Sequence, residues 1–312
     1  MFAVAKFGSH CRDDQISSSD QDLLLVCDKV HQFKYTQEFK RIGYSVSSYT
    51  PKQLHHMRDS GSLFLQHLKL ESLVTHDTGN MFRDFLETCE LRPPSNAEIT
   101  RCEESIRFLL SWPEASEITS LKVDCLYCLV RDYLIKQLSR QNILAFGMKD
   151  IVSQASTLWN IPSERFWGLR RARDVKNLYR LGSRVAHKDS SRILVSLVDV
   201  LTRINDKLAF PPPRNLSNLC EAFSDLPPSN YLLLRTLEAA NTIAESRQVP
   251  HPKKDRIHKL ITNPNAYGSS SKFRRMELVA LLNDIIGILT TADSLKTGQR
   301  ATAGSPINVD AL

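Results

Sequence analysis

The sequence lacks any apolar run long enough to cross a bilayer. Its longest apolar stretch, Leu278–Leu289, is interrupted by Asn283 and Asp284, whereas a membrane-spanning helix needs about 18 or more apolar residues. The N-terminus, MFAVAKFGSH, has an apolar stretch of about five residues, which is too short for the core of a secretory signal peptide. We therefore expect no membrane association.

Cysteine is sparse and irregularly spaced. The chain has seven cysteines, an odd number, and their spacing forms no disulfide framework. Cys125 and Cys128 form an isolated C-x-x-C pair without further ligands at a spacing suited to zinc. We interpret them as small residues on a buried helix face, and we expect a reducing, cytoplasmic compartment.

Two common enzyme signatures are also missing. The chain has no G-x-S-x-G of the α/β-hydrolases, and its glycine-serine stretch 267–271 lacks the spacing and lysine of a phosphate-binding loop. What is present is positive charge: 41 Lys and Arg against 34 Asp and Glu, a net charge of +7. This charge permits an anionic partner such as a nucleotide or nucleic acid.

Hydrophobic patterning divides the chain into a mixed N-terminal part and a helical remainder. Before residue 78, the apolar runs 2–7 and 23–26 are typical of strands, as is the alternating segment 44–49, which is rich in serine and tyrosine; Pro51 is placed to open a helix. A length of 312 residues fits about two domains. The sequence thus predicts an α+β fold, in which a small mixed-sheet domain precedes an all-α region.

From residue 78 onward, apolar residues recur at spacings of three and four, which indicates helices. The predicted helices cover 79–91, 97–111, 118–141, 147–158, 163–187, 190–208, 214–224, 230–247, 253–263 and 273–293. Proline clusters suggest boundaries. We expect a sheet domain over 1–92, a helical bundle over 93–210, a further helical subdomain over 211–297 and a disordered tail over 298–312.

A pair of carboxylates stands at the start of the second predicted strand. Asp20 and Asp22 are two residues apart, so both side chains lie on the same face of that strand. Two neighbouring carboxylates repel each other unless a cation bridges them or their pKa values shift. Mg²⁺ suits such a pair because it binds one or two carboxylates and completes its shell with phosphate and water.

A possible phosphate-binding turn precedes this pair. Gly8 and Ser9 follow the first apolar strand. Glycine lets the backbone approach a phosphate, and the serine hydroxyl and the following amides can donate hydrogen bonds to it. Metal binding and phosphate binding would then converge on one nucleoside triphosphate.

This stretch resembles the signature of minimal nucleotidyltransferases, which belong to the DNA polymerase beta superfamily. The segment reads GSHCRDDQISSSDQDLLLV, and its matching positions are Gly8, Ser9, Arg12, Ser19, Asp20 and Asp22. Including YTPKQLHHMRDSGSLF, the resemblance covers about residues 2–77. It implies that Asp20 and Asp22 bind Mg²⁺ or Mn²⁺ and take part in catalysis. Gly8, Ser9, Arg12 and Ser19 would bind an NTP, with ATP expected, for transfer of an NMP to a protein, RNA or small-molecule hydroxyl.

The sequence departs from this family at one chemically important position. The family has a third acid on the third strand, and the corresponding position here falls near Ser45. Glu38, Glu71 and Asp77 are carboxylates elsewhere in this part, but none is in register with the motif. An alternative is therefore a nucleotide- or RNA-binding module with impaired catalysis, which neutralises a partner or takes part in defence.

Cations recur at helical spacing in the predicted helix 163–187 and just beyond it. The series consists of Arg173, Lys176, Arg180, Arg184 and Lys188. On a continuous helix these residues form one stripe, whose mutual repulsion an anion would offset. We interpret the stripe either as a contact for nucleotide phosphate or nucleic acid, or as a solvated helix face.

A third alternative rests on Arg180 and His187. Their separation by six residues, LGSRVA, is similar to the arginine–histidine spacing of the HEPN family of helical ribonucleases. In that reading the arginine would bind phosphate and the histidine would transfer a proton. Leu181 occupies the position at which that family usually has a polar residue.

Overall fold

The computed structural model describes residues 2–12, 21–183, 185–209, 223, 227–262 and 272–297. The chain divides into two compact units. The first unit combines residues 1–95 with 134–160, and the second combines 96–133 with 161–312. Helix α6 (Thr119–Arg140) contributes residues to both.

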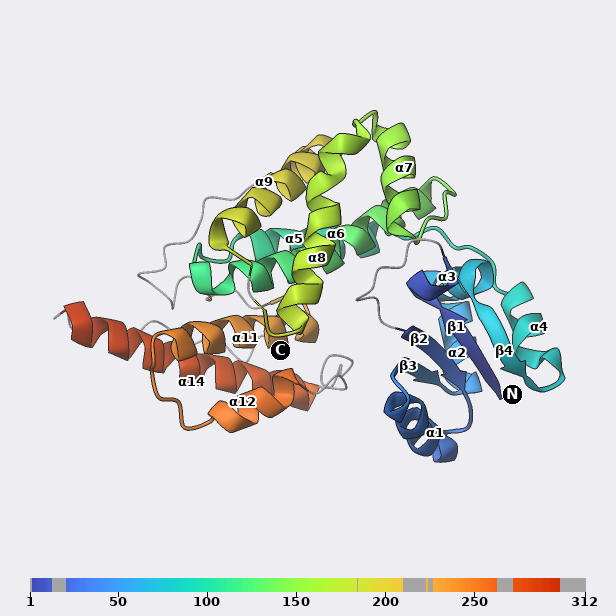
Figure 1. Cartoon of the computed structure of the whole chain (residues 1–312), viewed down its shortest axis with the longest axis horizontal. Coiled ribbons are helices and arrows are strands. Elements are labelled where there is room, and N and C mark those ends of the chain that lie inside the picture. The colour runs from blue at the N-terminus through green and yellow to red at the C-terminus, as the bar shows by residue number, and fades with distance from the viewer. Residues whose placement is uncertain are drawn as a thin grey trace. The chain divides into compact units, whose positions relative to one another are not determined.

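A mixed four-stranded sheet forms the centre of the first unit (Figure 1). It consists of β1 (Ala3–Phe7), β2 (Gln21–Val26), β3 (Tyr44–Tyr49) and β4 (Leu73–Asp77), in the order β3-β2-β1-β4. β1 runs antiparallel to both β2 and β4, whereas β2 and β3 are parallel. The three strands expected from the apolar runs are confirmed.

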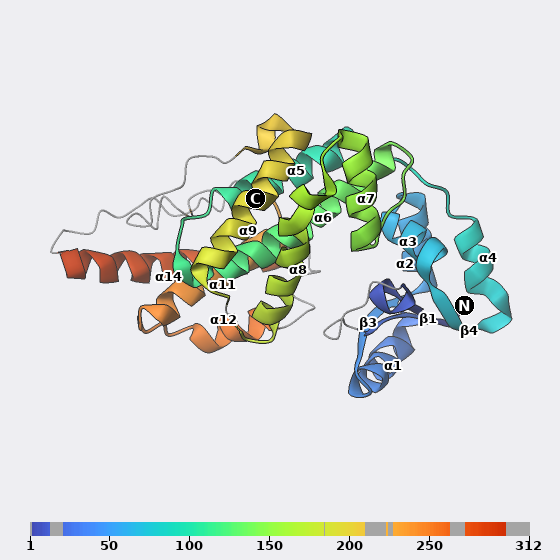
Figure 2. The same cartoon turned by 45° about the horizontal axis from the view of Figure 1, so that its top comes forward.

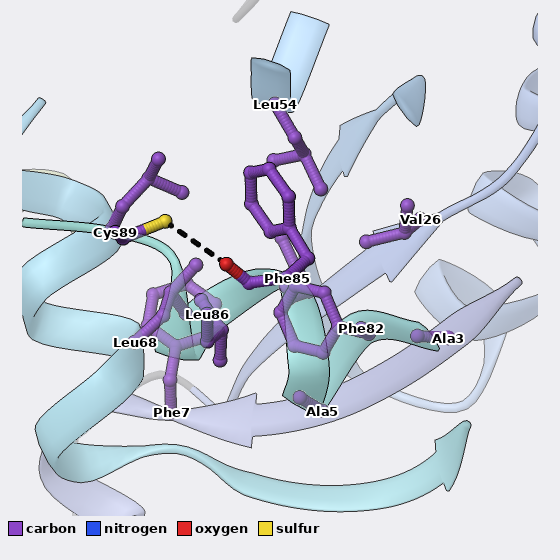
Figure 3. Packing of buried hydrophobic residues seen from close by; sticks show 12 residues of the cluster. Ala3, Ala5, Phe7, Val26, Leu54, Leu68, Phe82, Phe85, Leu86 and Cys89 are labelled. Atoms are coloured by element: carbon purple, nitrogen blue, oxygen red, sulfur yellow. Dashed lines mark hydrogen bonds between the residues drawn. The ribbon is translucent and has the colours of Figure 1, made fainter. Parts of the chain in front are cut away.

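Helices cover both faces of this sheet. Strand β2 is buried on both sides because its residues alternate between two apolar clusters: Leu24 and Val26 face one, and Leu23 and Leu25 face the other. One face packs against α1 (Lys29–Arg41) through Tyr35 and Phe39. The other packs against α2 (Pro51–Asp59), α3 (Leu63–Glu71) and α4 (Met81–Glu87), as Figure 3 shows.

Local sequence signals set the start of α2. The Thr50 hydroxyl accepts a hydrogen bond from the Gln53 amide at 3.2 Å, and the Gln53 side chain accepts one from the Thr50 amide at 2.8 Å. This capping box satisfies amides that would otherwise lack partners. Pro51 occupies the first turn, where its fixed φ favours the helix.

The described remainder of the chain is helical, which confirms the α+β class. Its α-helices are α5 (Asn96–Leu110), α6, α7 (Met148–Trp159), α8 (Trp167–Arg180), α9 (His187–Ile204), α11 (Asn230–Ser246), α12 (Lys254–Ile261) and α14 (Lys272–Thr297). Short 3-10 helices cover Gly8–Cys11 (η1), Thr78–Asn80 (η2), Ser116–Ile118 (η3), Ser163–Phe166 (η4) and Asp206–Leu208 (η5). Figures 1 and 2 show the labelled α-helices from two directions.

Two features differ from the sequence-based expectation. The helix expected over 163–187 ends at Arg180, and a separate helix begins at His187. Helix α1 was not expected from the sequence. None of its residues is buried, and its apolar residues Val30 and Phe33 are 86% and 77% exposed, so it lacks the buried apolar face that the prediction of helices relied on. The tail 298–312 and, except for Phe223, the expected helix 214–224 lie outside the described residues.

The structure also bears on membrane spanning and on cysteine chemistry. Within the described residues, no helix combines the length and apolarity that bilayer crossing requires. The six described cysteines are free thiols. Cys125 is fully buried, and burial raises the pKa of its thiol to about 12. This agrees with the interpretation of Cys125 as a small buried residue.

The apolar cluster in Figure 3 leads to a stability prediction. Leu68 is fully buried on α3, whereas Leu70, on the same helix, is 57% exposed. We expect Leu68→Ala to lower the free energy of unfolding of the first unit by about 2–5 kcal/mol. The matched variant Leu70→Ala should change it by less than about 0.5 kcal/mol. Urea denaturation followed by circular dichroism tests both, and equal effects would contradict this packing.

Candidate metal and phosphate site

The turn after β1 lies directly against the first described carboxylate of β2. Phe7 pairs with Asp22 in the antiparallel register, so Gly8 follows at the position beside Asp22. Gly8 has φ +79°, and a Cβ atom added to it would lie 2.7 Å from Asp22 Oδ2. Any side chain at position 8 would therefore displace the carboxylate, and the close approach requires glycine.

On the side of Asp22 that faces β3, its neighbour is Ser45. The parallel register of β2 and β3 pairs these two residues, so their side chains share one face of the sheet. Ser45 is exposed and Asp22 is partly buried. The structure thus places Ser45 directly beside Asp22, where the sequence analysis expected a third acid, and a serine hydroxyl offers no negative charge there.

The other carboxylates of this unit occupy different places. Asp77 pairs with Ala3 at the far end of β1, and its two oxygens accept hydrogen bonds from the Phe82 and Arg83 amides, each at 3.0 Å. Glu38 is exposed on α1, which covers the face of the sheet opposite to that of Asp22. Neither replaces the third acid.

Part of the predicted site lies outside the described residues. Asp20 and Ser19 fall in the range 13–20, which the structure does not describe. Among the described residues, no three His, Cys, Asp or Glu side chains are grouped so as to hold a metal ion. Metal binding by Asp20 and Asp22 together therefore stays a prediction. The chemistry of Asp22 fits Mg²⁺ or Mn²⁺, which prefer carboxylate oxygen.

Arg12, four residues beyond Gly8, belongs to a compact charged cluster. Its guanidinium forms an ion pair with Glu71, and His67 Nε2 lies 2.9 Å from Glu71 Oε2. The three side chains are between 13% and 16% exposed. Burial alone would raise the pKa of Glu71, but the hydrogen bond from His67 and the charge of Arg12 outweigh it and lower that pKa. The carboxylate form is therefore favoured.

Aromatic contacts hold this cluster in place. The His67 ring stacks on Phe146 at a centroid distance of 4.8 Å and meets the edge of Phe7 at 5.8 Å. Phe7 is the register partner of Asp22, so the cluster adjoins the carboxylate end of the site. Arg12 was expected from the sequence, but its partners were not; the i,i+4 spacing of His67 and Glu71 on α3 was the available signal.

The predicted cationic stripe is shorter than expected. Arg173, Lys176 and Arg180 lie on α8, whereas Lys188 lies on α9 and Arg184 is outside the described residues. The expectation of one continuous stripe was wrong because the helix ends at Arg180.

Within α8, the charges are partly offset inside the protein. The Lys176 ammonium lies 5.3 Å from the centre of the Tyr127 ring, and burial lowers the pKa of this lysine. The Arg180 guanidinium lies 3.5 Å from the fully buried Asp124 carboxylate. No external anion is needed to explain the position of Arg180.

Asp124 also binds Arg235, which links two carboxylates. Arg235 forms an ion pair with Asp124 and donates a hydrogen bond of 2.7 Å to Glu238. The Tyr179 hydroxyl donates to the other oxygen of Glu238 at 2.7 Å. Burial and the nearby carboxylate raise the pKa of Tyr179, so its hydroxyl stays protonated and able to donate. Each buried charge in this network thus has an opposite charge beside it.

The arginine and histidine of the ribonuclease alternative have separate surroundings. Arg180 lines a cavity together with Tyr231 and Arg235. His187 instead lines a groove with Lys188 and Trp167, and its Nδ1 lies 2.8 Å from the Thr119 hydroxyl. The described residues do not bring Arg180 and His187 into one cavity, and the ribonuclease pair stays a prediction.

No protein family, curated protein or solved structure matches the chain. The likeness to nucleotidyltransferases therefore stays an expectation from the motif residues in the sequence.

The Arg12 cluster predicts a pH-dependent contribution to stability. Glu71→Gln should lower the free energy of unfolding at pH 7 by about 1.5–3 kcal/mol, the range for hydrogen bonds to charged groups. Because the folded-state pKa of Glu71 is lowered, this stabilisation is fully present above the unfolded pKa of about 4.3 and is lost as pH falls through the folded pKa. Denaturant titrations from pH 3 to pH 8 measure the difference.

Glu87→Gln is the matched control. Glu87 forms an ion pair with Lys69 at 3.1 Å, but its side chain is 77% exposed, so its loss should have little effect at any pH. An effect of Glu71→Gln that is the same at pH 3 and pH 7 would contradict the charged cluster.

The close approach of Gly8 to Asp22 predicts that a methyl group added at position 8 affects both stability and Mg-ATP binding. Gly8→Ala should distort the turn and lower stability by about 1–3 kcal/mol, the cost of a strained left-handed backbone, and it should also weaken Mg-ATP binding. Gly43→Ala is the control, since Gly43 has φ +94° but no atom within 4 Å of an added Cβ. Isothermal titration with Mg-ATP distinguishes them. Equal affinity of both variants would rule out a role for the close approach.

Proposed function

We propose that the protein is a metal-dependent nucleotidyltransferase that transfers an NMP from an NTP to a hydroxyl group. The observation that carries this proposal is the close approach of Gly8 to the Asp22 carboxylate, where β1 ends and β2 begins. A bare backbone turn and a carboxylate in contact are what a metal–triphosphate needs, because the turn can accommodate phosphate and the carboxylate can bind the cation.

Each residue has a role in this proposal. Asp20 and Asp22 would hold Mg²⁺ or Mn²⁺, which when bound neutralises phosphate charge. Gly8, Ser9 and Ser19 would contact the triphosphate through amides and hydroxyls. Arg12 would place a positive charge near the phosphates, and Glu71 and His67 fix its direction.

The reaction would join an acceptor oxygen to the α-phosphorus and release pyrophosphate. ATP is the expected NTP, and the acceptor would be a hydroxyl of a protein, an RNA or a small molecule. In such a reaction the protein acts mainly by positioning the reactants and stabilising charge. The helical unit would select the acceptor, and the compartment would be cytoplasmic.

A second candidate is nucleotide binding without transfer. It is favoured by the register that pairs Ser45 with Asp22. A third carboxylate at that position would add negative charge for a second cation or accept a proton from the acceptor, and serine does neither at neutral pH. In this alternative the protein binds a nucleotide or RNA and neutralises a partner.

Substitution of Asp22 tests the site. Asp22→Asn should abolish Mg²⁺-dependent ATP binding and any transfer of label from α-³²P-ATP to protein or RNA. The control Asp28→Asn removes the same charge from an exposed residue just beyond the opposite end of β2 and should bind ATP like the wild type. Unchanged ATP affinity in Asp22→Asn would refute both functions.

Ser45→Asp separates the two functions. If the wild type binds Mg-ATP without transferring label and Ser45→Asp gains transfer, the missing acid is the reason for inactivity. If the wild type transfers label, a third acid at this position is not required, and the binding-only alternative is refuted.

A further inference from the structure

A groove runs along the second unit between the start of α8 and the outer face of α9. The two helices lie side by side (Figures 1 and 2). The groove has a volume of about 750 Å³. It is lined by Arg165, Trp167, His187, Lys188, Ser191, Arg192, Val195, Ser196 and Asp199. None of these residues belongs to the proposed nucleotidyltransferase site.

The wall that carries Trp167 is fixed by close packing. A Cβ atom added to Gly168 would lie 2.5 Å from Ser196 Oγ and 3.2 Å from the Ile193 carbonyl, so α8 and α9 meet almost backbone to backbone there. The Ser196 hydroxyl donates to the Arg165 carbonyl at 3.4 Å, and Arg165 lies 3.7 Å from Asp199. These contacts on either side of Trp167 fix the backbone that carries its ring.

The apolar part of the groove is unusually exposed for its residue types. Trp167 is 42% exposed and Val195 is 60% exposed, whereas Trp112, in the same unit, is 1% exposed. An indole ring offers a large flat surface, and exposed aromatic rings of this kind stack with nucleobases. Apolar surface exposed to water is unfavourable, so a ligand that covers the exposed surface of Trp167 and Val195 would gain binding free energy.

Two cations stand along the same face of α9. Lys188 and Arg192 are exposed and four residues apart, which places them about 6 Å from each other along the helix. Neither forms an ion pair with any residue that the structure describes. Asp199 is the one acid among the groove residues, and Arg165 and Arg203 both lie within 4 Å of it. The groove therefore has a net positive charge.

We propose that this groove binds a single-stranded nucleic-acid segment, with a base stacked on Trp167 and backbone phosphates on Lys188 and Arg192. A flat ring beside two cations one helical turn apart matches the alternation of bases and phosphates in a single strand. An acidic peptide would satisfy the cations but would make no specific use of the flat ring. The site needs neither a metal ion nor the residues around Asp22.

Fluorescence anisotropy with the full-length chain tests the proposal. The probe is a labelled 12-nucleotide single-stranded RNA in EDTA, which prevents metal-dependent binding at the first unit. We expect Trp167→Leu to weaken binding about tenfold, consistent with loss of one stacked base. The double variant Lys188→Gln/Arg192→Gln should flatten the slope of log K against log salt by about 1.4, from about 0.7 for each phosphate contact on a single strand.

Matched controls identify the groove as the binding surface. Trp159→Phe alters a partly buried tryptophan of the first unit, and Lys259→Gln removes one exposed charge from α12; both should bind like the wild type. Asp22→Asn should also bind normally, so that failure of the nucleotidyltransferase proposal would not affect this one. Labelled AMP should bind much more weakly than the RNA, because it offers one base and one phosphate.

Four outcomes would overturn the proposal. The first is unchanged RNA affinity in Trp167→Leu. The second is AMP affinity equal to that of the RNA, which would indicate a mononucleotide site. The third is a poly-glutamate peptide that competes as well as unlabelled RNA does. The fourth is a loss of dimer mass in Trp167→Leu by analytical ultracentrifugation, which would mean that a second copy of the chain covers the groove.

Discussion

The antiparallel pairing of β1 with β2 is the constraint on which the candidate site depends. This register sets Phe7 opposite Asp22 and so brings the Gly8 turn against the Asp22 carboxylate, although the two residues are fourteen positions apart in the chain. The apolar residues of β2 hold the register because a slip by one residue would turn Leu24 and Val26 toward the wrong face. The burial of the apolar residues of β2 thus fixes both the packing of the sheet and the position of Asp22 beside Gly8.

The two strands beside Asp22 bear differently on the two functions proposed for the first unit. Asp22 has the Gly8 turn on one side and Ser45 on the other. The first neighbour suits a metal-bound phosphate, while the second lacks the charge that proton transfer or a second cation requires. Our proposals for the first unit follow from this asymmetry. The two proposed functions differ in what they require of position 45 on β3, where transfer would call for an acid and the chain has serine.

In the second unit, buried charge has a different role. Arg235 bridges Asp124 and Glu238, and Arg180 approaches Asp124 from the end of α8. Removing one member would leave an uncompensated buried charge, which costs several kcal/mol, on the order of 3–5. These ion pairs therefore tie α6, α8 and α11 together. The surface cations that stay available for a partner are others, such as Lys188 and Arg192 on α9.

The sequence by itself determined the α+β class and the residue types of the candidate motif. Period-two and three-to-four spacing predicted three strands and most helices, and Pro51 predicted where α2 begins. Those signals are local, so they can be read without the fold. Tertiary structure decided the rest. The Arg12–His67–Glu71 cluster joins residues up to 59 positions apart. The break between α8 and α9 placed the cations of the expected stripe on two helices, and Trp167 is 42% exposed next to the close contact at Gly168. Such features depend on which elements meet in space, and residue spacing along the chain carries no record of that.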